Sequence, residues 1–531
     1  MSLNIKEEIL RVESLVGENS AQSVLQTTLD LSGSAPSIGR IAWIKPTAVI
    51  SDAVAAADKV NLEGYVDLKV VYVAEGFDDE PPNYQVVSYR QAITFSDYVE
   101  LIGAEAGMLV HAKVDLLGLE CQVKHDQRAV DVDLLVQFSA RVKQRYRIQA
   151  VTNASVKPPK KLAVEEGIFT IQPLLKTAVT ALSVARELAV ETEDQVKFVL
   201  DANFAPHIES THVEPSQITL TGNINLGVIC LNEAGSVQSY AYPKAFPFTV
   251  SIPNEAKSAE IAVKPEVMAD LKVDLNLADN SFFLSGDLRF KLDLYESRQV
   301  RIVHGLSGSG GCVVESRTET VMLDHVVNEK SQQSAAQGVI ELASNYPPIR
   351  EIIAAEGRVV NVDYRIDDDK VYVEGGISID VTYLAHTEEE HKPLYRVSFS
   401  NAVPFQQMIA IGGVQPGMVA ELEIDISQIS LDLINRETIE ADVAYRSLLK
   451  VIEPVQRDIV VEAVEVPPME EDPPTITYVF VHETDTLWKL SRQYHTSLEA
   501  ILEANSWLRE REPVRILPGD KLCIPRKTLT A

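Results

Sequence analysis

An internal repeat constrains this chain more than any other feature of its sequence. The segment Asp58–Gly64 reads DKVNLEG and Asp369–Gly375 reads DKVYVEG, at an offset of 311 residues (369 minus 58). A third and more divergent copy, Ile218–Cys230, aligns with Val60–Tyr72 at an offset of 158 (218 minus 60). A period of about 155 residues is too long for a solenoid unit and fits a whole domain. The chain is therefore predicted to hold three copies of one domain.

Alternating hydrophobic and polar residues predict the fold of the repeated domain. In the first copy the even-numbered residues are apolar, namely Val60, Leu62, Val66, Leu68, Val70 and Tyr72. The odd-numbered residues between them include the polar Asn61, Glu63, Asp67 and Lys69. This period of two is typical of a strand with one buried and one wet face. A glycine recurs on the apolar parity (Gly64, Gly222, Gly375), which indicates a β-bulge or a close backbone approach. Each repeat is predicted to be antiparallel and sandwich-like.

Two stretches near the starts of repeats have helical spacing instead. They are Ile9, Val12, Leu15 and Val16 in the first repeat, and Val179, Leu182, Val184, Ala185 and Leu188 in the second. Residues spaced by three and four line one face of a helix. A short helix is therefore predicted at the entrance of each of these two repeats.

These patterns divide the chain into five parts. Residues 1–155, 156–310 and 311–466 form the three repeats, residues 467–475 a linker, and residues 476–526 a small C-terminal domain. The sequence PPMEEDPP over residues 467–474 combines four prolines with three acidic residues. Such a composition is typical of a stiff, extended tether.

The excess of acidic residues behind the net charge of −29 lies in the first 475 residues. The chain has 48 Lys and Arg against 77 Asp and Glu, whereas residues 476–526 hold seven of each sign. An acidic surface repels nucleic-acid phosphates and anionic lipid headgroups, so neither is expected as a ligand. It suits a basic partner, or it serves only to keep the chain soluble.

The sequence predicts a protein of a reducing, cytoplasmic compartment. Residues 1–17 lack the basic and apolar regions of a signal peptide, and no apolar run reaches the ~18 residues of a membrane helix. The cysteines are far apart and each lies in an apolar or glycine-rich stretch: Cys121, Cys230, Cys312 and Cys523. They are expected to be buried free thiols.

The C-terminal domain shows a strand-helix-helix-strand order. Tyr478–Val481 is a short strand, and Asp485 is expected to cap the first helix. Thr496 and Glu499 form a T-x-x-E capping box for the second helix. A turn at Leu517–Asp520 then leads into a return strand at 521–525.

This domain resembles the LysM family over essentially its whole length. The matching residues are Tyr478-Val479, Asp485-Thr486-Leu487-Trp488, Leu490, Tyr494, Thr496-Ser497, Glu499, Leu502, Ala504-Asn505, Leu517-Pro518-Gly519-Asp520-Lys521-Leu522 and Ile524-Pro525. The resemblance implies a βααβ fold with a shallow groove that in the family holds N-acetylglucosamine-containing glycans. Carried over, one side of the groove is Asp485, Thr486 and Leu487, and the other is Asn505, Ile516, Leu517, Pro518 and Gly519. Backbone amides and apolar side chains suit such ligands.

The groove departs from the family pattern in ways that favour a protein ligand over a glycan. Thr484 stands where the family usually has glycine, and His482-Glu483 before it is unusual. The stretch WLREREP at 507–513 is bulkier and more charged than a glycan-binding loop. Trp488 is compatible with either a core position or a contact position.

The repeats and the C-terminal domain together resemble SPOCS-domain spore-envelope proteins of the SipL type. That resemblance implies a mother-cell protein recruited to the forespore surface, where it helps the basement layer of the spore coat to assemble. It also implies that the LysM module binds the coat morphogenetic ATPase. The alternative function is binding of peptidoglycan or chitin-type glycan through LysM. A wall hydrolase targeted by LysM is a third and weaker alternative.

No motif in the sequence points to an enzyme, a cofactor or a metal. H-E-x-x-H, G-x-S-x-G and the phosphate-binding loop are absent, and Gly305–Gly311 reads as a flexible loop. The pairs His386/His391 and His207/His212 have a separation awkward for metal binding, and Asp367–Asp369 reads as a charged turn. The chain is therefore predicted to be a non-enzymatic scaffold or adaptor.

Overall fold

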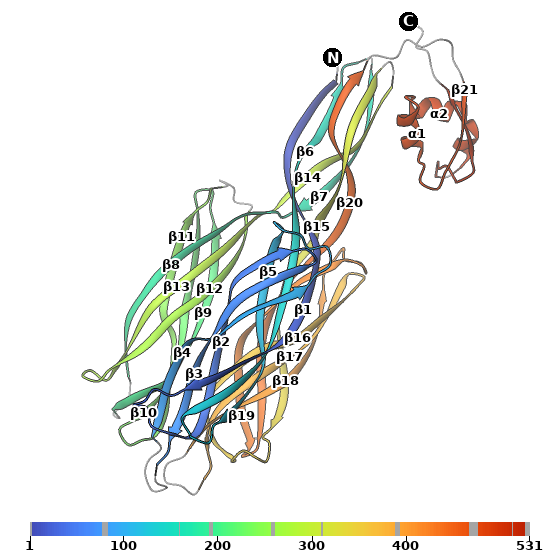
Figure 1. Ribbon diagram of the computed structural model, residues 1–531. Helices are drawn as coiled ribbons and strands as arrows, with labels where there is room; N and C mark the ends of the chain where they lie inside the picture. Colours follow the sequence, from blue (N-terminus) through green and yellow to red (C-terminus); the bar gives the residue numbers. More distant parts are fainter. Residues whose placement is uncertain are drawn as a thin grey trace.

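The computed structural model describes residues 3–76, 83–158, 160–190, 195–255, 261–309, 312–387, 393–466, 476–511 and 513–525. Three elongated β-repeats are followed by a small domain with two short helices (Figure 1). The predicted fold class, mainly antiparallel β with an α+β C-terminal domain, is confirmed. The predicted linker at 467–475 lies outside the described residues.

The first and third repeats have the same six-strand topology, with two facing three-stranded sheets. In the first repeat the sheet orders are β1-β6-β5 and β2-β3-β4. Its strands are β1 (Leu3–Asp30), β2 (Ile38–Ala56), β3 (Lys59–Ala74), β4 (Tyr84–Glu100), β5 (Leu109–Val123) and β6 (Ala129–Val156). In the third repeat the orders are β15-β20-β19 and β16-β17-β18. Its strands are β15 (Val313–Glu341), β16 (Ile349–Asp367), β17 (Lys370–Ala385), β18 (Leu394–Ala410), β19 (Val419–Asn435) and β20 (Thr438–Val466).

The middle repeat has the same two sheets, but its two long strands are each interrupted. Its sheets have the orders β11-β10-β9 and β12-β13-β8, and β7 pairs separately with β14. The strands are β7 (Lys161–Ile171), β8 (Leu174–Ala189), β9 (Val196–Val213), β10 (Gln217–Asn232), β11 (Val237–Pro253), β12 (Ile261–Asn276), β13 (Ser281–Glu296) and β14 (Arg298–Ser309). Pro173 lies in the gap between β7 and β8, where its missing N–H interrupts the ladder.

The two helices predicted at the repeat entrances are wrong, because both stretches are strands. In β1 the core receives Leu10 and Val12, which alternate with period two, while Ile9 is 51% exposed. A register shift between Leu15 and Gly17 places Val16 at a bulge, and this insertion imitates helical spacing. In β8 the side chain of Val179 is likewise turned outward. The flexible loop predicted at Gly305–Gly311 is also wrong over residues 305–309, because these residues pair with β7 as the end of β14.

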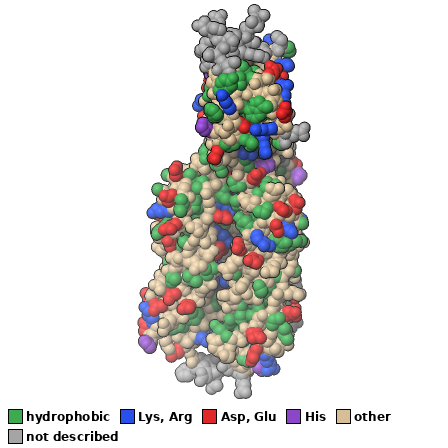
Figure 2. Space-filling model, turned by 90° about the vertical axis from the view of Figure 1, so that its right-hand side faces the viewer, with side chains coloured by type: hydrophobic (Ala, Val, Ile, Leu, Met, Phe, Trp, Pro, Cys, Tyr) green, Lys and Arg blue, Asp and Glu red, His purple; other side chains and the backbone are tan. Residues whose placement is uncertain are grey.

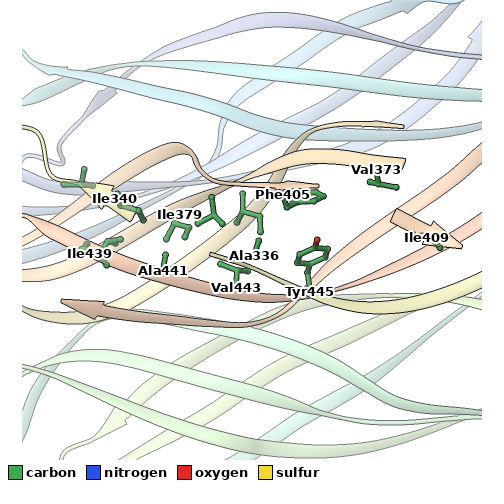
Figure 3. Packing of buried hydrophobic residues seen from close by; sticks show 14 of the residues in the cluster. Ala336, Ile340, Val373, Ile379, Phe405, Ile409, Ile439, Ala441, Val443 and Tyr445 are labelled. Carbon is green, nitrogen blue, oxygen red and sulfur yellow. The ribbon is translucent and has the colours of Figure 1, made fainter. Parts of the chain in front are cut away.

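The recurring glycine provides space for an aromatic pair in the core of every repeat. A Cβ on Gly64 would lie 2.4 Å from Cζ of Phe95, and one on Gly222 would lie 2.5 Å from Cζ of Phe248. The equivalent pairs join the two sheets with ring centroids close together: Phe95–Phe138 at 5.0 Å, Phe248–Phe290 at 5.2 Å and Phe405–Tyr445 at 4.9 Å. In the third repeat Figure 3 shows side chains from both sheets pointing toward one another around Phe405 and Tyr445. The predicted close approach is therefore a packing requirement.

The aspartate of the DKV motif closes a turn. Asp58 and Asp369 both have φ of +56° between two strands. Their carboxylates accept N–H groups from Gly103 at 2.8 Å and Gly413 at 2.6 Å, which ties the turn to the next loop. Aspartate tolerates this left-handed conformation better than most residues. The prediction of a charged turn at Asp367–Asp369 agrees with this arrangement.

The three repeats lie around one long axis, as the subunits of a trimer would. The ribbons β1/β6, β7/β14 and β15/β20 continue past the sandwiches as a stalk (Figure 1). Their inward side chains form shared clusters to which each repeat contributes: Leu10, Val12, Ile148, Phe169, Ile171, Val300, Ile302, Val321, Leu323, Val455 and Ile459. Below the stalk, one sheet from each repeat (β2-β3-β4, β11-β10-β9 and β16-β17-β18) contributes to another shared cluster. This cluster includes Trp43, Leu200 and Leu384.

An ion network accompanies that lower junction. The Lys45 ammonium lies 3.5 Å from Asp201 and 3.0 Å from Glu356, so it joins all three repeats. Lys69 lies 2.8 Å from Asp201, whose side chain is only 4% exposed. Lys45 and Glu356 are separated by the repeat offset (356 minus 45 is 311). Equivalent positions thus carry opposite charges, which makes the contact between different repeats attractive.

The four cysteines are free thiols, as predicted, but not all are buried. Cys230 and Cys312 are buried, whereas Cys523 is half-buried and Cys121 is exposed. Cys121 lies on β5, an outer strand of its sheet, and pairs there with the buried Val132 of β6, so its exposure comes from its place at the sheet edge. The expectation that every cysteine is buried is therefore wrong for Cys121 and only partly met by Cys523.

Candidate functional site

The C-terminal module is built on one small hydrophobic core. Its strands β21 (Ile476–Phe480) and β22 (Lys521–Pro525) are antiparallel, and between them lie α1 (Leu487–Gln493), α2 (Leu498–Ala504) and the 3-10 turn η1 (Ser506–Glu510). The core holds Val481, Leu490, Ile501, Leu508, Leu522 and Ile524. This is the βααβ order that the resemblance implied.

Both helix caps lie one residue later than predicted. Thr486, not Asp485, caps α1 by accepting the Lys489 N–H at 3.1 Å. Ser497, not Thr496, caps α2 by accepting the Ala500 N–H at 3.1 Å. In both places two adjacent residues could act as caps, and only the one directly before the first helical residue reaches the free amides. The Thr496 hydroxyl donates to the Pro525 carbonyl instead.

Asp485 closes the loop on one side of the candidate groove. Its carboxylate accepts the His482 N–H at 2.9 Å and lies 3.3 Å from the Lys489 ammonium. The backbone hydrogen bond from His482, followed by the nearby Lys489, holds the pKa of Asp485 below its usual range. Beside it Thr486 is exposed, and Leu487 packs partly against the core. This side of the groove therefore offers few free polar groups.

The other side is an exposed turn held by Asp520. Leu517 is 42% exposed and Pro518 and Gly519 are exposed, while Ile516 packs partly against the core. The Leu517 N–H donates to the Asp520 carboxylate at 2.8 Å, and Arg511 forms an ion pair with the same group at 2.6 Å. Gly519 has φ of +91°, which suits glycine. The turn thus presents a rigid apolar tip.

The two sides are neighbours because backbone hydrogen bonds join them. The Gly519 N–H donates to the Val481 carbonyl at 2.8 Å, and the Val481 N–H donates to the Asp520 carbonyl at 2.9 Å. The loop that begins at His482 therefore lies beside the turn at Leu517–Asp520. The structure brings these two groups of candidate residues together.

Asn505 does not belong to the accessible part of this site. It is 2% exposed, and its amide donates to the carbonyls of Ile501 at 2.8 Å and Cys523 at 2.6 Å. Its side-chain oxygen accepts the Cys523 N–H at 2.8 Å. All of its polar atoms are therefore occupied in tying α2 to β22, so its role is structural.

Two exposed aromatic residues on β21 were not among the groove residues predicted from the sequence. Tyr478 is 58% exposed and Phe480 is 61% exposed, and the Lys521 ammonium lies 4.3 Å from the centre of the Tyr478 ring. Figure 2 shows hydrophobic side chains gathered on the module, near the top of that view. Along the chain Tyr478 and Phe480 alternate with Val479 and Val481, which pack in the core. This alternation is typical of a strand with an aromatic outer face, and it is the sequence signal from which the two residues could have been predicted.

A cleft of about 1030 Å³ is lined by residues of both α1 and the stalk. The stalk contributes Glu165, His304, Val314, Glu315, Ser316, Thr320, Gln456, Arg457 and Asp458, and the module contributes Thr486, Trp488, Lys489, Arg492, Gln493 and His495. Trp488, whose role was left open by the sequence, faces the stalk at Gly305. Of the predicted groove residues only Thr486 lines this cleft.

Among the described residues no group of three or more His, Cys, Asp or Glu side chains is arranged to hold a metal. His207 and His212 lie on β9, and His212 contacts Glu214 at 3.3 Å. His391 is outside the described residues, so its pairing with His386 has no structural description. No described helix is long and apolar enough to cross a bilayer.

Comparison with protein families finds two kinds of domain in this chain. A family model described as SipL, SPOCS domain, matches residues 37–124 and 348–434, and the LysM domain model matches residues 481–525. No curated protein and no solved structure matches the chain. The chain thus carries two SPOCS domains of the SipL kind and a C-terminal LysM domain, as the resemblance indicated.

The SPOCS matches fall in the first and third repeats, which share features that the middle repeat lacks. Tyr72 and Tyr383 each donate a hydroxyl hydrogen bond at 3.0 Å, to the carbonyls of Pro36 and Pro347. The middle repeat has Cys230 at this position and Ser216 at the position of Asp58. It keeps the glycine and the aromatic pair, and with them the same sandwich.

Proposed function

We propose that this protein is a non-enzymatic scaffold of spore-coat assembly whose LysM module binds a protein, the coat morphogenetic ATPase. The combination of SPOCS and LysM domains supports a sporulation-related protein with a LysM module. In this proposal it acts in the mother-cell cytoplasm at the forespore surface.

The observation that carries the protein-binding part is the exposed apolar tip of the groove. Leu517 and Pro518 project beside a loop whose carboxylate, Asp485, is already committed to His482 and Lys489. An exposed Leu-Pro tip on a rigid turn suits an apolar pocket of a protein partner. Glycan recognition would also need polar groups that are free to bind hydroxyls.

The alternative function, binding of a peptidoglycan- or chitin-type glycan, is favoured by two observations. LysM is generally a glycan-binding module, and this chain matches that family over residues 481–525. The exposed rings of Tyr478 and Phe480 also offer apolar faces of the kind that sugars stack on. N-acetylglucosamine-containing glycan is therefore the second ligand to test.

The deciding experiment is titration of the full chain with the purified ATPase and, separately, with chito-oligosaccharide. We expect binding to the ATPase, and Leu517→Ala should weaken it about tenfold because it removes a buried apolar contact. Leu433→Ala is the matched control, since Leu433 on the third repeat is 39% exposed and far from the module in sequence. Binding of the oligosaccharide without binding of the ATPase would replace this proposal by the glycan alternative.

A further inference from the structure

The LysM module contacts the stalk through α1. A Cβ added to Gly305 of β14 would lie 2.4 Å from Nε1 of Trp488 and 2.7 Å from its Cε2 and Cζ2. The indole therefore rests directly on the backbone of a residue without a side chain. Four residues along α1, the Arg492 guanidinium donates to the Ser316 carbonyl of β15 at 2.8 Å. One helix thus holds two neighbouring ribbons of the stalk.

The stalk offers three similar faces, and Gly305 distinguishes one of them. Each ribbon has a β-bulge near the same height, which places Thr152 on β6, His304 on β14 and Val461 on β20 outside the regular pairing. The residue after each bulge is Asn153, Gly305 or Glu462. Because only the middle ribbon has glycine there, only that ribbon can accept an indole against its backbone.

Charge favours the same contact. The stalk side of the cleft carries Glu165, Glu315 and Asp458, and α1 carries Lys489 and Arg492. Arg457 is a basic residue on the stalk side of the cleft. Opposite charges across an open cleft attract at moderate range and orient the approaching surfaces.

We propose that Trp488 and Gly305 form a latch that fixes the LysM module on one face of the stalk. The groove is then presented in a defined direction, independent of the linker. The tip at Leu517–Gly519 is not part of the cleft and remains accessible to a partner. The middle repeat, which carries no SPOCS match, has in this proposal a task of its own, because it supplies the glycine.

The test is ¹⁹F NMR of the full chain labelled with 5-fluorotryptophan. The chain has three tryptophans, so Trp43 reports on the junction of the repeats, Trp507 on the LysM core and Trp488 on the latch. Gly305→Asn places on β14 the residue type that β6 has at this position. We expect it to move only the Trp488 signal, toward the frequency and the H₂O/D₂O isotope shift of an exposed indole.

Two further variants complete the experiment. Glu462→Asn makes a change at the equivalent position of β20 and should leave all three signals in place. Arg492→Ala keeps Gly305 and removes only the hydrogen bond to Ser316, so it should move the Trp488 signal part of the way. An indole already exposed in the unaltered chain, or a Trp488 signal that neither Gly305→Asn nor Arg492→Ala moves, would overturn the latch. If Gly305→Asn disturbs all three signals, Arg492→Ala alone decides. Since no ligand is present, the result is independent of what the groove binds.

Discussion

At the scale of single residues, the recurring glycine is the position least tolerant of change. A Cβ on Gly222 would lie 2.3 Å from the His207 carbonyl oxygen and 2.5 Å from Cζ of Phe248. Neither group can move freely, because one belongs to the backbone of β9 and the other is half of the aromatic pair with Phe290. Overpacking of this kind typically costs a few kcal/mol.

Gly222→Ala is therefore expected to lower the free energy of unfolding of the middle repeat by about 3 kcal/mol. The measurement is urea denaturation followed by circular dichroism. Gly227→Ala is the matched control, since Gly227 lies on the same strand and a Cβ there meets no atom within 4 Å. The control should be neutral or slightly stabilising, because alanine restricts the unfolded chain more than glycine does. Equal effects of the two substitutions would contradict the packing explanation.

The candidate site shows what residue patterns alone could and could not predict. The family motif located the exposed tip at Leu517–Gly519 and the loop at Asp485–Leu487, which the structure brings together. The motif could not distinguish residues that contact a ligand from residues that only support the fold. Asn505 was therefore placed in the groove, although its amide makes all of its hydrogen bonds inside the module. Hydrogen-bond partners distant in sequence decide that difference, and a single sequence does not display them.

At the scale of elements, the strands were predictable wherever the apolar period was regular. The sandwich followed from the alternation in β3, which is repeated in β10 and β17. The prediction failed at β1 and β8, where a bulge or an outward apolar residue imitated helical spacing. In such stretches the hydrophobic pattern is ambiguous, and pairing with a remote strand resolves it.

The capping residues lead to a prediction about α2. Ser497→Ala removes the acceptor for the Ala500 N–H and should destabilise the first turn by about 1 kcal/mol. Amide hydrogen exchange in α2 of the full chain should then be about fivefold faster, as about 1 kcal/mol implies. Ser506→Ala is the control, because Ser506 is exposed and is the first residue of η1, so it does not cap α2. Unchanged exchange in Ser497→Ala would show that the helix is held by packing alone.

At the scale of the whole molecule, the arrangement of the repeats around one axis was not predictable from the repeat pattern. Residues that join the repeats, such as Trp43 and Leu200, differ from one copy to the next. Repetition reveals what each domain needs for its own core. The contacts between domains depend on how the copies have diverged, and the opposite charges at Lys45 and Glu356 are the clearest case.

The stability of this junction is expected to depend on pH through the carboxyl group of Glu356. Burial by itself would raise the pKa of its carboxyl, but the Arg396 and Lys45 charges outweigh burial and lower the pKa to about 2. A carboxyl whose pKa is lower in the folded than in the unfolded protein stabilises the fold above its unfolded pKa. That contribution is lost as the pH falls from 4.5, the ordinary pKa of a glutamate carboxyl, to about 2. The three-repeat body should accordingly loosen in this acidic range.

Glu356→Gln should therefore cost on the order of 3 kcal/mol at pH 7, since it leaves Lys45 and Arg396 half-compensated. Its urea midpoint should approach that of the unaltered chain as the pH falls toward 2, because both chains then lack the charge. Glu351→Gln on the same strand, where the side chain is exposed, should follow the unaltered chain at every pH. A constant difference between Glu356→Gln and the unaltered chain from pH 7 to pH 2 would mean that shape, not charge, holds this junction. In that case the opposite charges at equivalent positions of the first and third repeats would not be what selects the contact between them.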